Sequence, residues 1–316
     1  MTAGQPGAAR RPVALFVLGS ARSGTSALTR LLSLCGGALP DGIVSADSNN
    51  PRGYWEPAAS LRLNGAILRR RGSGCFDPAL RLQEEGGFDA KEKAACIAKI
   101  GAFLTTLPAA PVVVIKDLQI TLLSDVWFEA AHRAGFDIVT VIAVRHPQET
   151  IASWSSHARI SPELANALWL KYNLLAERYT RGLPRVFVEY GNVLDDWRRE
   201  TKRISTALAI DLNTRDESAI DEFLNRDLRR QRHPGPVTEF DGADLSSAVY
   251  EALLAAARDE PWDQSALDRV CEAYRASENG FRTAFEDYRS LSNRLSLRMF
   301  IMDLVRIGRM VRYALS

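Results

Sequence analysis

Short apolar runs alternate along the chain with segments in which apolar residues recur at helical spacing. Four runs are rich in β-branched residues, and runs of this kind form strands that are buried on both faces. They cover residues 13–18, 112–115, 138–144 and 185–188. Because a helical pattern follows each run, we expect an α/β fold with a central parallel sheet flanked by helices.

The helical segments have apolar residues three or four positions apart and are bounded by Gly, Pro or Asp. The first has Leu28, Leu31, Leu32 and Cys35 on one face and is followed by two glycines. A further helix is expected to begin near Pro147, since proline is favoured in a first helical turn. The first helix covers residues 25–35, and the other predicted helices cover residues 57–71, 91–107, 162–181, 195–208 and 243–257.

The last third of the chain is expected to be helical and increasingly basic. Residues 234–236 read Pro-Gly-Pro and mark a break. We therefore predict a disordered lead-in over residues 1–11, an α/β domain over 12–233 and a helical region over 234–316 that packs on it. In residues 295–316 apolar positions alternate with arginines, a pattern that suits packing on the domain or contact with a membrane surface.

The composition is that of a globular protein, with 46% hydrophobic and 25% charged residues among 316. These fractions exclude disordered and collagen-like classes, and no run approaches the roughly 18 apolar residues of a membrane span. The four cysteines stand far apart without a Cys-x-x-Cys pair, so we expect neither a zinc site nor a disulfide framework, and a cytoplasmic location. The net charge is +2, with 34 arginines but six lysines, and we expect no nucleic-acid partner.

Residues 19–26 read Gly-Ser-Ala-Arg-Ser-Gly-Thr-Ser, between the first predicted strand and the first predicted helix. They fit the frame of a phosphate-binding P-loop, except that Thr25 stands where the lysine belongs. Backbone N–H groups of residues 23–26 at a helix start can still bind an anion. The basic residue of the loop is Arg22 instead. The loop is therefore expected to bind a phosphate, but not to bind a γ-phosphate strongly, because the lysine that contacts the γ-phosphate is absent.

A second, separate anion site is predicted after the third strand. Arg145 ends that strand, and Ser153 lies eight residues later in the helix that begins near Pro147. An arginine before a helix and a serine two turns into it can reach one anion across the helix start. As a strand-end residue, Arg145 is expected at the surface.

These segments, in this order, resemble the sulfotransferase family, whose donor is 3′-phosphoadenosine-5′-phosphosulfate (PAPS). Residues 22–26 are similar to the family's 5′-phosphosulfate loop, the Arg145–Ser153 spacing is similar to its 3′-phosphate site, and Tyr190 matches a tyrosine near the adenosine. Residues 50–56 are similar to a segment of bacterial members. The resemblance implies a P-loop-like three-layer fold. The donor-binding residues that it implies are Arg22, Ser23, Gly24, Thr25, Ser26, Arg145, Ser153 and Tyr190.

The chain departs from the family pattern at two points. Gly191 and Asn192 stand in place of the Glu-Asp of the adenosine segment. Cytosolic members have a catalytic histidine two residues after a lysine at the end of the second strand, but Lys116 is followed by Asp117 and Leu118.

Sulfuryl transfer requires in-line positioning, stabilisation of negative charge and a base for the acceptor proton. Arg22 and Lys116 are the predicted cations, and no metal is required, although Lys116 could instead pair with Asp117 at the surface. Glu56 is the first candidate base because related sulfotransferases use a glutamate. Asp117 and His157 are the alternatives.

Other functions stay open at this point. A P-loop kinase or ATPase is disfavoured by Thr25, and a non-catalytic nucleotide-binding protein at a membrane is suggested by the basic tail. The acceptor is expected to be a hydroxyl or amine of a small molecule, a glycolipid or a carbohydrate. Basic residues 229–233 could close over the 3′-phosphate. Aromatic residues that could shape an acceptor pocket are Tyr54, Trp55, Trp154 and Trp169.

Overall fold

The computed structural model describes residues 11–47, 50–83, 87–158, 160–214, 216–224, 231–233, 235–237 and 245–277. This part of the chain contains a parallel sheet with strand order β2-β1-β3-β4. Its strands are β1 (Val13–Gly19), β2 (Val112–Lys116), β3 (Asp137–Val144) and β4 (Arg185–Glu189). The α/β fold class with a central parallel sheet is therefore confirmed.

Helices connect and flank the strands. Ten of them in the described residues are α1 (Thr25–Leu34), α2 (Ala58–Arg70), α3 (Ala90–Leu104), α4 (Ser124–Arg133), α5 (Pro147–Ala158), α6 (Pro162–Tyr179), α7 (Tyr190–Asp195), α8 (Trp197–Leu208), α9 (Glu217–Phe223) and α10 (Leu245–Ala257). The 3-10 helices are η1 (Arg81–Gln83) and η2 (Leu118–Leu123). A last described helix covers residues 264–277.

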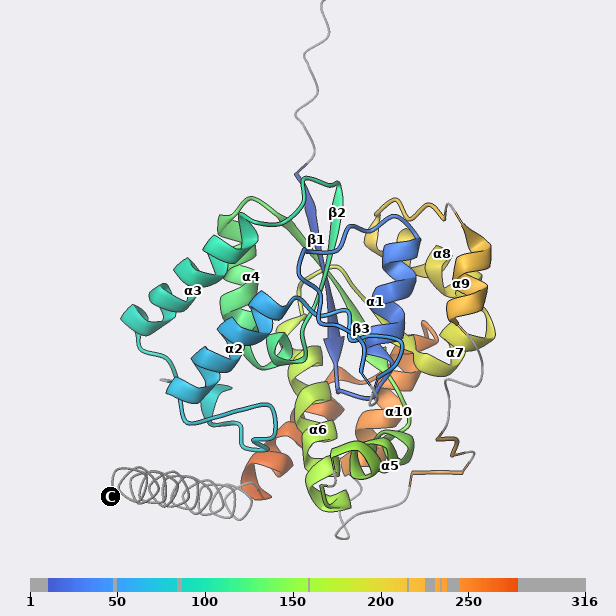
Figure 1. The fold of residues 1–316 in the computed structure, drawn as a ribbon. Coiled ribbons are helices and arrows are strands. Elements are labelled where there is room, and N and C mark those ends of the chain that lie inside the picture. The colour runs from blue at the N-terminus through green and yellow to red at the C-terminus, as the bar shows by residue number, and fades with distance from the viewer. Residues whose placement is uncertain are drawn as a thin grey trace, which may run out of the picture.

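The side chains of the central strand β1 alternate between two apolar layers, as the two-residue period of a strand requires. Phe16 and Leu18 pack with residues of α2, α3, α4, α6 and α10 on one face. Leu15 and Val17 pack with residues of α1, α8 and α9 on the other. Figure 1 shows α1, α8 and α9 on one side of the sheet and α2, α3 and α4 on the opposite side, which gives three layers.

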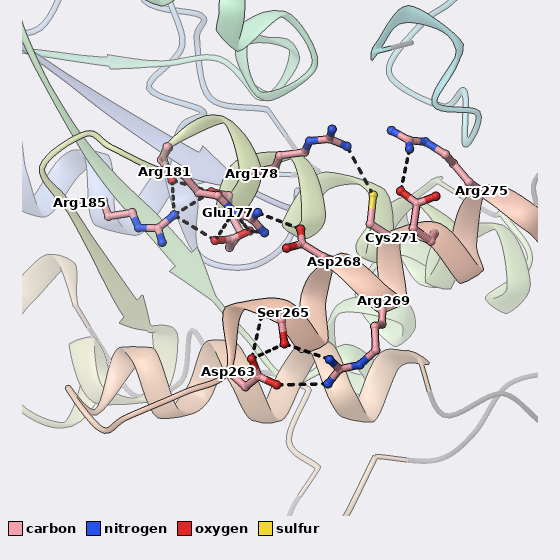
Figure 2. Close-up of polar contacts among 12 residues, drawn as sticks. Glu177, Arg178, Arg181, Arg185, Asp263, Ser265, Asp268, Arg269, Cys271 and Arg275 are labelled. Carbon is pink, nitrogen blue, oxygen red and sulfur yellow. Dashed lines mark hydrogen bonds and ion pairs between the residues drawn. The ribbon is translucent and has the colours of Figure 1, made fainter. Parts of the chain in front are cut away.

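The helix at residues 264–277 lies against α6, and Arg178 of α6 donates from Nη1 to Cys271 Sγ at 3.9 Å (Figure 2). Arg181 Nη1, just after α6, lies 2.8 Å from Asp268 Oδ1. The buried Tyr274 hydroxyl donates to the carbonyl of Pro78 at 2.7 Å. The same helix therefore supports the loop that precedes η1.

The pattern of the sequence did not predict α4, η2 or α9. All are short, and α4 mixes polar residues with its buried Val126 and Trp127. Residues 1–10 of the predicted lead-in, residues 229 and 230 of the basic stretch and the basic tail lie outside the described residues. Arg11, the last residue of the predicted lead-in, is described, and its Nε donates to the carbonyl of Gly135 at 2.9 Å. None of the described helices combines the length and the apolar character needed to cross a membrane.

Candidate active site

All four strands bring a predicted site residue to the carboxyl edge of the sheet. Arg22 lies in the loop after β1, Lys116 ends β2, Arg145 follows β3 and Tyr190 follows β4. Because the strands are parallel, their carboxyl ends meet at one edge, where ligands of open α/β sheets bind. The strand order thus gathers residues that are far apart in the sequence.

The loop after β1 has an unusual backbone at two positions. Arg22 has φ 66° and Gly24 has φ 88°, both in the left-handed region. A Cβ atom on Gly24 would lie 2.2 Å from Cδ2 of Tyr190, so the aromatic ring packs directly on the glycine. Within the described part of the chain no side chain caps α1, which leaves the first amides of that helix for an anion.

A pocket of about 160 Å³ opens at this edge of the sheet. It is lined by Arg22, Gly24, Thr25, Ser26, Ala27, Asn50, Pro51, Arg52, Gly53, Arg145, Ser153, His157, Tyr190, Phe223 and Gln231. Seven of the eight residues that the resemblance implies for the donor are in this set. The eighth, Ser23, is buried beside it, and its hydroxyl has no hydrogen-bond partner among the described residues.

The two predicted anion sites touch each other in this pocket. Arg22 Nε donates to Ser153 Oγ at 3.0 Å, and Arg145 Nη1 donates to the carbonyl of Arg22 at 2.8 Å. The Arg145 guanidinium lies 5.0 Å from the centre of the Tyr190 ring. The sites are therefore contiguous, although the sequence predicted them as separate.

Arg145 is buried, with 7% of the residue exposed, whereas the sequence predicted a surface residue. Its Nε lies 2.9 Å from Oε2 of Glu149, and the Glu149 side chain is itself fully buried. The other oxygen of Glu149 accepts the backbone N–H of His233 at 3.1 Å. Arg145 Nη2 donates to the carbonyl of Gln231 at 3.1 Å. The segment at residues 231–233 is therefore hydrogen-bonded both to Arg145 and to its counter-ion Glu149.

Lys116 and Glu56 form a buried ion pair, with 2.6 Å between Nζ and Oε1. Lys116 Nζ also donates to Ser26 Oγ and to the carbonyl of Tyr54, each at 3.3 Å. Glu56 Oε1 accepts the N–H of Leu118 at 3.3 Å. Lys116 therefore pairs with Glu56 rather than with Asp117, and it links Glu56 to the first turn of α1.

Asp117 is held in the interior. Its carboxylate accepts from Gln119 N and from Asn64 Nδ2, each at 2.8 Å, and the residue is 1% exposed. Burial, followed by the charge of Glu56, raises the pKa of Asp117 to about 6. Asp117 therefore caps η2 and is held by hydrogen bonds from Gln119 and Asn64, so its carboxylate stabilises the fold at this position.

His157 lies on α5 at the mouth of the pocket. Its Nε2 is 3.2 Å from Nη2 of Arg22, and its Nδ1 is 2.9 Å from the carbonyl of Ser153. A guanidinium can only donate, so Nε2 accepts and Nδ1 carries the proton that the carbonyl accepts. This arrangement orients His157 toward Arg22, where the sequence offered it as an alternative base.

Sequence reasoning missed several residues of the pocket. Arg52 Nη1 donates to the carbonyl of Glu222 at 3.2 Å, and its guanidinium lies 5.6 Å from the ring centre of Phe223. This contact ties the segment at residues 50–56 to α9. Phe223 belongs to no local pattern, so tertiary structure alone brings it to the site, whereas Gln231 lies in the stretch 229–233 that the sequence placed near the 3′-phosphate.

The described residues contain no group of three or more His, Cys, Asp or Glu side chains that could hold a metal ion.

No family model matches the chain, and no curated protein matches it by sequence. One solved structure that is similar to the chain is the sulfotransferase domain of the olefin synthase of Synechococcus PCC 7002. The TM-score is 0.39 and the sequence identity is 17%, and the match covers 87% of this chain and 98% of that domain. Another is a sulfotransferase from Alicyclobacillus acidocaldarius, with a TM-score of 0.37, 16% identity and coverage of 83% and 100%.

Proposed function

We propose that this protein is a sulfotransferase that moves the sulfuryl group of PAPS to an acceptor hydroxyl. The observation that carries the proposal is the joining of two anion-binding elements in one pocket. The loop after β1 and the Arg145–Ser153 pair meet through the hydrogen bonds of Arg22. A donor that carries anionic groups at both the 3′ and the 5′ position of one ribose requires two such elements close together.

The residues of the pocket suit such a donor. The amides at the start of α1 and Arg22 would hold its phosphosulfate, while Arg145 and Ser153 would hold its 3′-phosphate. The Ser23 hydroxyl is buried and has no hydrogen-bond partner among the described residues, so it could donate a further hydrogen bond to the phosphosulfate. The Tyr190 ring, packed on Gly24 and beside Arg145, offers an apolar surface to the adenine.

The proposed reaction forms a bond between the acceptor oxygen and sulfur while the bond from sulfur to the bridging phosphate oxygen breaks. The electron pair of that bond leaves with adenosine 3′,5′-bisphosphate. Arg22 stabilises the negative charge that develops on the leaving oxygen. Because the sulfuryl group carries less charge than a phosphoryl group, protein cations suffice for this task.

Glu56 takes the acceptor proton in this proposal. Its Oε1 is held by Lys116 and by the N–H of Leu118, and these contacts fix the carboxylate for proton transfer. The three hydrogen bonds of the Lys116 ammonium end on Glu56, Ser26 and the Tyr54 carbonyl. Lys116 therefore positions the base against the loop and supplies positive charge to the reaction centre.

Thermal unfolding with adenosine 3′,5′-bisphosphate tests the proposal. A ligand that binds the native state at 100 times its Kd stabilises it by about 2.7 kcal/mol. For a chain of this size, with an unfolding entropy of about 2.1 cal/mol/K per residue, the expected rise in Tm is about 4 °C. ATP with Mg²⁺ is the comparison. A rise with ATP and Mg²⁺ but none with the bisphosphate would replace the sulfotransferase proposal by a P-loop kinase or ATPase.

A further inference from the structure

Phe76 is an aromatic side chain that the fold leaves in contact with solvent. Among the described residues it is the one exposed large hydrophobic residue, at 39% exposure. A ligand that covers an exposed apolar ring removes apolar area from water, and this contributes favourably to binding. The surroundings of Phe76 show what could cover it.

The exposure of Phe76 does not come from a loose loop. Tyr172 OH donates to the carbonyl of Cys75 at 3.0 Å, and the buried Lys171 donates from Nζ to the carbonyl of Asp77 at 2.8 Å. The Asp77 side chain accepts the N–H of Ala79 at 2.9 Å. Hydrogen bonds therefore fix the backbone on both sides of Phe76.

The Phe76 ring packs on Trp154 of α5, with ring centres 5.5 Å apart and an interplanar angle of 65°. Trp154 is almost fully buried and forms a small apolar cluster with Ile151 and Ala165. The partly buried residues that pack against this cluster are also apolar. They are Ala21, Leu118, Ala158 and Ile160. Phe76 and these four partly buried residues are called the Phe76 surface below, and the buried Trp154, Ile151 and Ala165 lie beneath it.

The Phe76 surface adjoins both sides of the proposed reaction centre. Ala21 directly precedes Arg22, and Trp154 directly follows Ser153, which accepts from Arg22. On the other side, the N–H of Leu118 donates to Oε1 of Glu56 at 3.3 Å. An acceptor hydroxyl placed between Arg22 and Glu56 would therefore have its carbon skeleton beside apolar side chains.

From this juxtaposition we infer that the Phe76 surface is the acceptor subsite and that it selects hydrophobic alcohols over carbohydrates. The inference rests on the proposed function and narrows its acceptor class. Every member of the Phe76 surface is apolar, so a polyhydroxylated sugar would lose hydrogen bonds to water there without replacement. An aliphatic or aromatic body would instead cover Phe76 and remove apolar area from water.

Binding of 4-nitrobenzyl alcohol without any donor tests the inference independently of the proposed function. This uncharged hydroxyl compound carries a nitroaromatic ring that quenches tryptophan fluorescence. We expect saturable quenching that is smaller in Trp154→Phe and that 1-octanol reverses while methyl glucoside does not. Absence of saturable quenching, or reversal by the glucoside, would overturn the inference.

The Phe76→Ala variant should weaken binding of 4-nitrobenzyl alcohol about tenfold, because the exposed part of one ring loses its partner. Phe76→Leu should restore most of the affinity. The matched control is Phe103→Ala, since Phe103 is a partly buried ring of α3 that packs on Trp127 with ring centres 5.6 Å apart. Equal affinities in Phe76→Ala and Phe103→Ala would overturn the inference.

Stabilisation of the protein by adenosine 3′,5′-bisphosphate separates the two proposals. If adenosine 3′,5′-bisphosphate fails to stabilise the protein while the alcohol binds as expected, the proposed function fails and the Phe76 surface stands as a hydrophobic ligand site. In an active enzyme, Phe76→Ala should raise the KM for a hydrophobic alcohol about tenfold with kcat little changed. Loss of kcat at an unchanged KM would overturn the assignment of Phe76 to acceptor binding.

Discussion

Arg145 donates a hydrogen bond from Nη1 to the backbone carbonyl of Arg22 at 2.8 Å. This bond joins the end of β3 to the loop after β1, and Arg22 continues the connection to Ser153 on α5. A change at Arg145 should therefore alter the loop as well as the proposed 3′-phosphate site. Tests of the two sites need variants that keep the fold.

The first prediction concerns the charge of Arg145. A single Arg145→Ala change would leave the fully buried Glu149 carboxylate without its cation, at a cost of about 3–5 kcal/mol in stability. The double variant Arg145→Met with Glu149→Gln removes both charges and should keep the fold. Its affinity for adenosine 3′,5′-bisphosphate, measured by isothermal titration calorimetry, should fall by about 30-fold, because a charged hydrogen bond to phosphate is lost.

Glu149→Gln alone is the control for this double variant. It keeps the Arg145 guanidinium and removes the carboxylate that competes for it. Affinity for the bisphosphate should therefore be equal to or higher than that of the wild type. An equal loss of affinity in the single and double variants would mean that Arg145 holds the structure and does not bind the donor.

The second prediction concerns the proposed base. Glu56→Gln retains the shape of the side chain but cannot take a proton, so kcat should fall by about 100-fold or more. Binding of adenosine 3′,5′-bisphosphate should change little. Glu92→Gln is a matched control because Glu92 of α3 also forms a 2.8 Å ion pair, with Arg71 at the end of α2. Full turnover by Glu56→Gln would transfer the role to another group, with His157 the nearest to Arg22.

The third prediction is a dependence of stability on pH that comes from Asp117. Its pKa is raised from 3.8 to about 6 by burial, so between these pH values the native state holds a proton that the unfolded state has lost. Stability must then fall as pH rises from about 4 to about 6, by about 3 kcal/mol from this group. Asparagine cannot ionise, so Asp117→Asn should not show this loss.

Urea unfolding of the wild type and Asp117→Asn at pH 4 and pH 7 checks this prediction. The variant should gain stability relative to the wild type as the pH rises. The side-chain oxygen of the introduced asparagine can still accept from Gln119 N, so the cap of η2 is kept. A difference between the two proteins that is the same at both pH values would show that Asp117 ionises normally in the native state.

The four strands could be predicted because a strand buried on both faces carries an unbroken apolar run. The loop after β1 could also be predicted, since its glycines and helix start are local features. The pairing of Lys116 with Glu56 could not, because it depends on the segment before α2 folding back onto the end of β2. The burial of Arg145 likewise depends on residues 231–233, which reach it from a distant part of the chain.

The fourth prediction separates backbone strain from side-chain collision in the loop. Gly24 and Gly135 have the same φ of +88°, so alanine at either position is strained by about 1–2 kcal/mol. A Cβ atom on Gly135 would meet no described atom within 4 Å, whereas one on Gly24 would lie 2.2 Å from the Tyr190 ring. Gly24→Ala should therefore destabilise the protein more than Gly135→Ala in urea unfolding.

Gly24→Ala should also abolish binding of adenosine 3′,5′-bisphosphate, because the Tyr190 ring and the loop cannot both stay in place. In a Tyr190→Ala background, which lacks the ring, the further loss of stability caused by Gly24→Ala should be no larger than that of Gly135→Ala. If the two alanine variants are equally stable, Tyr190 does not pack on Gly24 in solution.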